Sequence, residues 1–114
     1  MPEISKDNGL ATLINVFTVA PEDQQRLVDM LNDATEKTMK HLPGFVSASI
    51  HKSLDGVRVA NYAQWRSRAD FEAMLKNPEA VVHMKPITEI ATFDAHLYEV
   101  SETNEVSKTR TVSE

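Results

Sequence analysis

The chain has 114 residues, 41% of them hydrophobic and 25% charged, which is typical of one globular domain rather than of a disordered or fibrous protein. The formal net charge is −5 and the Lys and Arg residues are scattered, so we expect no nucleic-acid partner. No Cys is present, which excludes disulfides, thiolate nucleophiles and iron–sulfur ligation. No apolar run approaches the roughly 18 residues of a membrane span, and the first residues lack a secretory pattern. We therefore expect a cytoplasmic protein with no membrane partner.

The first half of the chain predicts a strand, a helix and a second strand. Residues 1–9 are polar and are interpreted as a flexible N-terminal arm, and the β-branched residues of 10–19 predict the first strand. Pro21 suits a first helical turn, since its missing N–H has no partner there. Apolar residues at helical spacing then predict one helix of about five turns that ends before Pro43 and Gly44.

The next two strands form a predicted hairpin, residues 45–53 and 57–65, joined by Leu54-Asp55-Gly56. We expect a three-residue loop with Gly56 in the left-handed conformation. Ser53 would then pair with Val57, and a shorter loop would turn the face of one strand over relative to the other. The side chains with polar groups that this register places on one face are Ser47, Ser49, His51, Asn61 and Trp65.

The last third of the chain predicts a second helical region and a fourth strand. A short helix is expected from Ser67 to about Asn77, followed by a helix broken at Pro86 and a strand over 91–100. Residues 101–114 are interpreted as a polar tail, so the folded domain spans 10–100. The order β-α-β-β-α-β predicts an α+β, ferredoxin-like fold.

The hairpin carries apolar residues on both faces, yet two helices can cover only one face of a four-stranded sheet. The second face needs another layer, and a homodimer that packs sheet against sheet would supply it. The sequence therefore predicts a dimeric α+β barrel.

Polar groups on the predicted helix-covered face suggest a ligand cavity. Each buried polar group there needs a hydrogen-bond partner, and the groups could bond one another, contact water at a strand end, or bind a ligand. His51 could act as a general base, Asn61 could stabilise an oxyanion, and Trp65 could stack on an aromatic ligand or simply cap the core. Met74 and Met84 would suit an adaptable apolar pocket or ordinary core packing. No HxH, HExxH or glycine-rich phosphate motif is present, so the sequence signals no metal site and gives no support for nucleotide or flavin cofactors.

Two segments resemble a known family: Leu42-Pro43-Gly44-Phe45 and Asn61-Tyr62-Ala63-Gln64-Trp65. They are similar to the antibiotic biosynthesis monooxygenases, in particular to the cofactor-free, quinone-forming members of the actinorhodin-pathway type. The resemblance implies that a phenolic substrate reacts directly with O2. It implies catalytic roles for Asn61, Trp65 and His51. It also implies substrate contacts at two positions where this chain departs from the family pattern, Phe71 and Met84.

Two alternatives remain open from the sequence. Haem-degrading enzymes of the same fold use an Asn, a Trp and a His, and the corresponding positions here hold Asn15, Met74 and a nearby His83. His83 and Lys85, in the segment before the last strand, could also border the substrate pocket, although a solvated loop is the favoured interpretation of both. The other alternative is a non-catalytic dimeric domain that binds a small ligand, since fold does not settle function.

Overall fold

The computed structural model describes residues 3–6 and 8–106. The predicted β-α-β-β-α-β order is confirmed, with two consecutive helices in the second helical region. The elements are β1 (Ala11–Val19), α1 (Gln24–Lys37), β2 (Phe45–Lys52), β3 (Arg58–Trp65), α2 (Arg68–Leu75), α3 (Pro78–Ile90) and β4 (Ala91–Tyr98). Single 3₁₀ turns, Pro21–Asp23 and Met39–His41, precede and follow α1.

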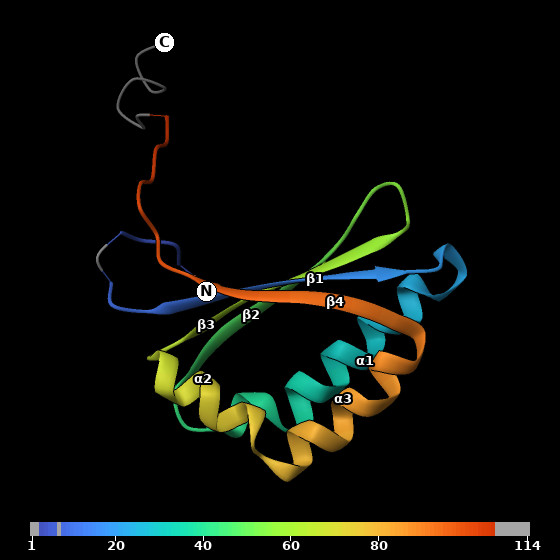
Figure 1. Cartoon of the computed structure of the whole chain (residues 1–114). Coiled ribbons are helices and arrows are strands. Elements are labelled where there is room, and N and C mark those ends of the chain that lie inside the picture. The colour runs from blue at the N-terminus through green and yellow to red at the C-terminus, as the bar shows by residue number, and fades with distance from the viewer. Residues whose placement is uncertain (1–2, 7, 107–114) are drawn as a thin grey trace.

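The four strands form one antiparallel sheet in the order β2-β3-β1-β4. All three helices lie on the same side of this sheet (Figure 1). We call the helix-covered side the inner face and the opposite side the outer face. Because side chains alternate along a strand, each strand contributes every second residue to the inner face.

α1 anchors the helical layer, and its buried stripe is the one that the sequence predicts. Leu27, Leu31 and Ala34 are buried, and the two leucines pack with Phe17 and Val59 of the sheet in the larger hydrophobic core. Their spacing of four and three residues follows the helical period, so all three point to the inner face. The packing of this face against the sheet is the main stabilising contact of α1.

α3 is one continuous helix with Pro86 inside it, so the predicted break is wrong. It begins at Asn77, whose side chain accepts bonds from the amides of Glu79 and Ala80 at 2.9 and 3.2 Å. Proline removes the bond to the carbonyl four residues earlier, that of Val82. Val82 is 69% exposed, so water can satisfy the freed carbonyl, while the fully buried Ile87 holds the following turn.

The β2–β3 loop has four residues, not the three predicted. The Ser53 amide donates to the Arg58 carbonyl at 3.0 Å, and Gly56 has the expected positive φ of 85°. The Ser53 hydroxyl donates to Asp55 at 2.7 Å and accepts from the Arg58 amide at 2.9 Å. These side-chain bonds stabilise the wider loop, which the glycine position alone did not reveal.

The extra loop residue shifts the pairing of β2 with β3 by one position. Ala48 lies opposite Ala63 and Ile50 lies opposite Asn61, and a bulge after Phe45 restores the pairing of Phe45 with Trp65. A shift of one residue transfers side chains to the other face. The prediction that three β2 side chains share a face with Asn61 is therefore wrong: Ser47, Ser49 and His51 lie on the outer face.

The described parts of the two terminal segments contact the domain and each other. The Glu3 carbonyl accepts a bond from the side chain of Gln64, and Lys6 forms an ion pair with Glu102 at 3.0 Å. Residues 1–2 and 7 of the predicted arm and 107–114 of the predicted tail lie outside the described residues, so the division at 10 and 100 stays a prediction. Within the described ranges, no helix is both long and apolar enough to cross a membrane.

Candidate active site

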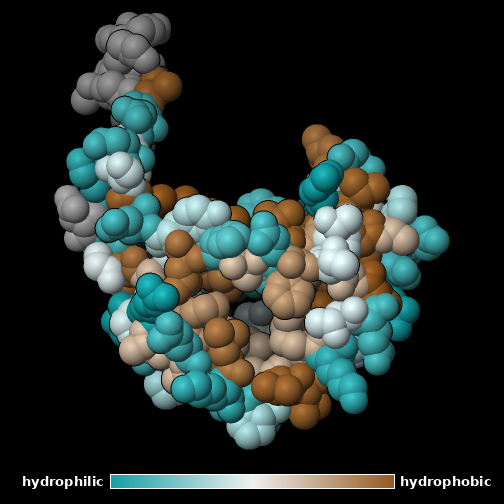
Figure 2. Space-filling model, viewed as in Figure 1, coloured by the Kyte–Doolittle hydropathy of each residue, from teal (hydrophilic) through white to brown (hydrophobic). Residues whose placement is uncertain are grey.

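A cavity of about 440 Å³ lies between the inner face of the sheet and the three helices. In the space-filling view it is a hollow surrounded by apolar residues (Figure 2). Most of its lining is aromatic, aliphatic or methionine side chains. Its size is typical of pockets that enclose small organic ligands.

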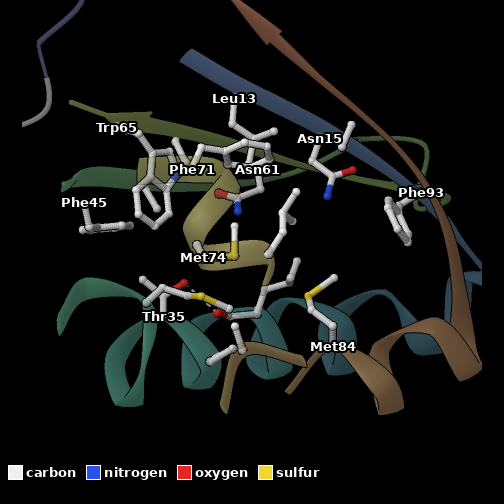
Figure 3. Close-up of a pocket in the computed structure, with 18 of the residues that line it drawn as sticks. Leu13, Asn15, Thr35, Phe45, Asn61, Trp65, Phe71, Met74, Met84 and Phe93 are labelled. Carbon is white, nitrogen blue, oxygen red and sulfur yellow. Dashed lines mark hydrogen bonds between the residues drawn. The ribbon is translucent and has the colours of Figure 1, made fainter. Parts of the chain in front are cut away.

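Aromatic rings form one end of the cavity. Trp65 meets Phe45 edge-on with ring centres 5.4 Å apart, and it meets Phe71 at 6.2 Å. Met74 of α2 lies beside them and lines the same space (Figure 3). Phe17 and Phe93, with centres 5.9 Å apart, line another part of the cavity. These flat surfaces favour a flat aromatic ligand.

The start of α2 sets the position of the Phe71 wall. The Ser67 hydroxyl accepts a bond from the Asp70 amide at 3.1 Å and caps the helix. Asp70 in turn packs against Gly44, which has a φ of 85° and where a Cβ would overlap the Asp70 carboxyl group. The Arg66 amide donates to the Gly44 carbonyl at 2.7 Å. The Pro43-Gly44 turn therefore supports α2 directly after β3.

Three polar side chains of the cavity have a buried atom with no hydrogen-bond partner. These atoms are the Asn15 and Asn61 side-chain oxygens and the indole N–H of Trp65. Asn15 and Asn61 are direct partners on β1 and β3, and both amides extend from the sheet toward the helices (Figure 3). An unpaired buried polar group costs roughly 1–3 kcal/mol, so three in one apolar space indicate a site that a ligand completes.

The structure brings together five of the nine predicted site residues: Asn61, Trp65, Phe71, Met74 and Met84 line the cavity. The outer-face residues Ser47, Ser49 and His51 do not line it, and neither does His83 on α3. The Ser47 hydroxyl instead donates to the buried Gln64 side chain at 2.6 Å, and His51 is exposed.

Among the lining residues that were not predicted for this site, Asn15 and Lys85 carry polar groups that could act on a ligand. Asn15 was considered only for haem degradation, although it lies between Leu13 and Phe17 on the buried face of β1. Asn15 could have been recognised from the sequence, because it is a single amide on an otherwise apolar face of the strand. Lys85 was considered as a residue at the edge of the pocket, but a solvated loop was favoured because of the expected break at Pro86. The continuous helix makes it part of the cavity lining.

The cavity is almost free of ionisable groups. Among the lining residues, all from the described part of the chain, Lys85 is the sole ionisable side chain. Within the described ranges no group of three or more His, Cys, Asp or Glu side chains is placed to hold a metal ion. The fold and the cavity thus define a ferredoxin-like α+β protein with an internal site for a flat, largely apolar molecule.

The relatives of the chain agree with this class. Residues 11–85 match the antibiotic biosynthesis monooxygenase family. Tetracenomycin-F1 monooxygenase of Streptomyces glaucescens is 54% identical over 83 residues, which are 73% of this chain and 74% of that protein. The chain belongs to the antibiotic biosynthesis monooxygenase family and is an oxidoreductase of the monooxygenase class. The predicted family and enzyme class are confirmed.

Solved structures confirm the predicted fold. A monooxygenase from the ActVA-Orf6 gene of Streptomyces coelicolor, in complex with nanaomycin D, superposes with a TM-score of 0.76 at 25% identity, covering 87% of this chain and 93% of that one. A single-residue variant of SnoaB, a cofactor-independent oxygenase from Streptomyces nogalater, gives a TM-score of 0.74 at 21% identity over 83% and 96% of the two chains. The finer predicted likeness to the actinorhodin type is weaker than the likeness to the tetracenomycin-F1 enzyme.

Proposed function

We propose that the chain is a cofactor-independent monooxygenase that oxidises a polycyclic phenol to a quinone with O2 in the inner-face cavity. The observation that carries this proposal is the set of unpaired polar atoms of Asn15, Asn61 and Trp65 in an apolar, aromatic-walled space. The names of the relatives support it: one acts on tetracenomycin F1, one binds nanaomycin D, and one is described as cofactor-independent.

The reaction balances with O2 as the oxidant. The phenol loses its hydroxyl proton, and the electron-rich ring transfers electrons to O2 and forms a C–O bond at the carbon para to the phenolic oxygen. The O–O bond of the resulting peroxide then breaks as that carbon loses its hydrogen, and water leaves. One substrate and one O2 thus yield one quinone and one water.

The cavity residues act by binding, orienting and stabilising charge. The Trp65 N–H and the Asn61 amide can donate to the substrate oxygen, where negative charge develops. Asn15 supplies a second amide directly beside Asn61. Hydrogen bonds to a phenolate favour the ionised form of the substrate, which promotes deprotonation without a base in the cavity. The apolar walls exclude water from the reactive intermediate.

His51 has no part in this proposal, because it lies on the outer face and is exposed. The haem-degrading alternative gains no specific support either. Asn15 does line the cavity, but His83 does not, and Met74 occupies the position that this alternative assigns to a Trp. Among the described residues no His lines the cavity, so the His that this alternative requires is missing there.

A second copy of the chain is the proposed partner at the outer face. Helices cover only the inner face (Figure 1), and the middle of the outer face carries Ile14, Val16, Ala60 and Tyr62. Packing of two such faces would bury these side chains, in keeping with the expected dimeric barrel. A Tyr62→Asp variant should convert a dimer to monomers in sedimentation analysis; a wild-type monomer at micromolar concentration would contradict this part of the proposal. The cytoplasmic location stays a prediction.

Oxygen uptake by metal-stripped protein tests the proposed reaction. The assay uses an anthrone or a dihydroxynaphthalene in air and follows quinone absorbance, with Asn61→Ala and Trp65→Phe as variants. We expect uptake without added cofactor, equal amounts of O2 consumed and quinone formed, and much slower turnover in both variants. Unchanged turnover in the variants, or a strict requirement for added flavin or metal, would contradict the proposal.

A further inference from the structure

Methionine side chains lie on the helical side of the cavity, opposite the donors of the sheet. Four of the five methionines belong to the described part of the chain, and three of these line the cavity: Met39, Met74 and Met84. They come from the 3₁₀ turn after α1, from α2 and from α3, respectively. In Figure 3 the sulfur-bearing ends of Met74 and Met84 extend from the helices toward the sheet. A ligand held by the donors of the sheet therefore has thioether groups on its other side.

The proposed reaction forms a peroxide on the same side as these sulfur atoms. The oxygen that bonds Asn61 and Trp65 is the phenolic one, whereas O2 adds at the para carbon, which is the opposite end of the ring. Because the phenolic oxygen is held at the sheet, the para carbon and its peroxide point away from the sheet, toward the methionines. Peroxides readily oxidise thioethers, so the cavity encloses an oxidant together with groups that it can oxidise.

We propose that Met74 is a modification site: in a minor branch of turnover, its sulfur takes the outer oxygen of the substrate peroxide and becomes a sulfoxide. The inference rests on the proposed function, which supplies the peroxide. Met74 packs in the hydrophobic cluster of Trp65 and Phe71, at the aromatic end of the cavity where a flat ring would stack. Met84 packs against the other cluster, with Phe17, so Met74 is closer to the bound ring.

The step balances in atoms and electrons. The sulfur donates an electron pair to the outer peroxide oxygen, the S–O bond forms and the O–O bond breaks. The inner oxygen keeps the electron pair of the broken bond, takes the proton of the hydroperoxide and stays on the ring carbon as a hydroxyl group. One hydroperoxide and one methionine thus yield one methionine sulfoxide and one hydroquinone, which is the tautomer of the hydroxylated ring.

Oxidation changes the wall that the substrate contacts. A sulfoxide is polar, whereas the surrounding wall of Trp65, Phe71 and Phe45 is aromatic. A flat ring that covers the sulfoxide oxygen removes it from water without supplying a hydrogen bond, so the affinity for substrate falls. The modification therefore accumulates with turnover and raises KM.

Turnover of an anthrone under isotopically labelled O2 tests the assignment, with catalase present to remove hydrogen peroxide from solution. The protein is digested after a counted number of turnovers and its methionines are measured by mass spectrometry. Met30 is the internal comparison, since it is also half-buried but does not line the cavity. Labelled sulfoxide at Met74 should grow with turnover and exceed that at Met30 at least about fivefold. KM should rise in parallel, and methionine sulfoxide reductase should restore it.

Two leucine variants remove one sulfur each at similar side-chain volume. In Met74→Leu, KM should stay constant over the same number of turnovers. Met30→Leu is the matched control and should show the wild-type rise in KM and the wild-type label at Met74. Equal labelling of Met30 and Met74, more label at Met39 or Met84 than at Met74, or the same rise in KM in Met74→Leu would overturn the inference.

Cumene hydroperoxide separates this inference from the proposed function, because it requires no turnover. This apolar aromatic peroxide should oxidise Met74 at least about threefold faster than Met30, and anthraquinone in the cavity should remove the difference. Failure of every phenol to turn over, together with this preference, would contradict the proposed reaction and leave the oxidation site standing. Turnover without labelled sulfoxide at Met74 would contradict only the inference.

Discussion

The two faces of the sheet carry similar polar side chains in different states. On the outer face Ser47 bonds Gln64 at 2.6 Å, and His96 bonds Asp94 at 2.7 Å. On the inner face Asn15, Asn61 and Trp65 each keep a buried polar atom without a partner. Polar groups that bond one another stabilise the fold, whereas unpaired ones at an apolar cavity await a ligand. The pairing state therefore distinguishes these cavity groups from the polar groups of the outer face.

The largest effect is expected for Asn61→Leu, which should lower activity without lowering stability. Loss of an oxyanion donor typically lowers kcat by roughly 10²–10³-fold. The free energy of unfolding should stay equal or rise, since the variant removes a buried unpaired oxygen. Paired measurements of quinone formation and urea unfolding check this. His51→Ala on the outer face is the matched control and should retain activity within about twofold. If His51→Ala lost more activity than Asn61→Leu, the catalytic role would belong to the outer face instead.

Two glycines test how the cover of the inner face is positioned. Gly44 and Gly56 both have φ of 85°, but a Cβ at Gly44 would overlap Asp70, whereas at Gly56 the nearest atom is 3.9 Å away. Ala at either position should cost about 1–2 kcal/mol of backbone strain. Only Gly44→Ala should also displace α2 and Phe71, adding about 1–3 kcal/mol and raising KM. Equal KM values in the two variants would show that Gly44 does not position the Phe71 wall.

Ser47→Ala should lower stability and leave activity unchanged, which is the reverse of the effect expected for Asn61→Leu. It leaves the oxygen of the buried Gln64 side chain without its partner, so the free energy of unfolding should fall by about 1–2 kcal/mol. Turnover should stay within about twofold, because Ser47 does not line the cavity. Thermal melting and oxygen uptake measure the two quantities. Loss of activity without loss of stability would return Ser47 to the list of site residues.

The smallest effect is expected in the β2–β3 loop, whose length determines which β2 side chains lie on each face of the sheet. Bonds from the Ser53 hydroxyl and then from the Val57 amide hold the pKa of the exposed Asp55 below its ordinary value of 3.8. The folded state thus favours the carboxylate, so its stabilisation is present above this value and is lost as pH falls through the lowered pKa. Wild-type stability should decrease more steeply than that of Asp55→Asn below about pH 4. Parallel pH profiles from pH 2 to 6 would contradict this.

Part of the cavity lining could be predicted from the sequence, and the rest could not. Asn61, Trp65 and Phe71 were predicted because their segment resembles the family. For Asn61 and Trp65, the alternation of side chains along β3 also places both on one face. Asn15 and Lys85 were missed for this site, since their place depends on the cross-strand partner of β1 and on the continuity of α3 through Pro86. Each of these depends on contacts between distant segments.

The amino-acid sequence by itself determined the order of the elements, the buried stripe of α1, the left-handed Gly56 and the family. These features follow from local backbone preferences, from hydrophobic period and from short motifs. Only the tertiary structure decided which β2 side chains face the cavity. One extra loop residue, stabilised by Ser53 and Asp55, moved His51 to the outer face, because strand side chains alternate with a period of two.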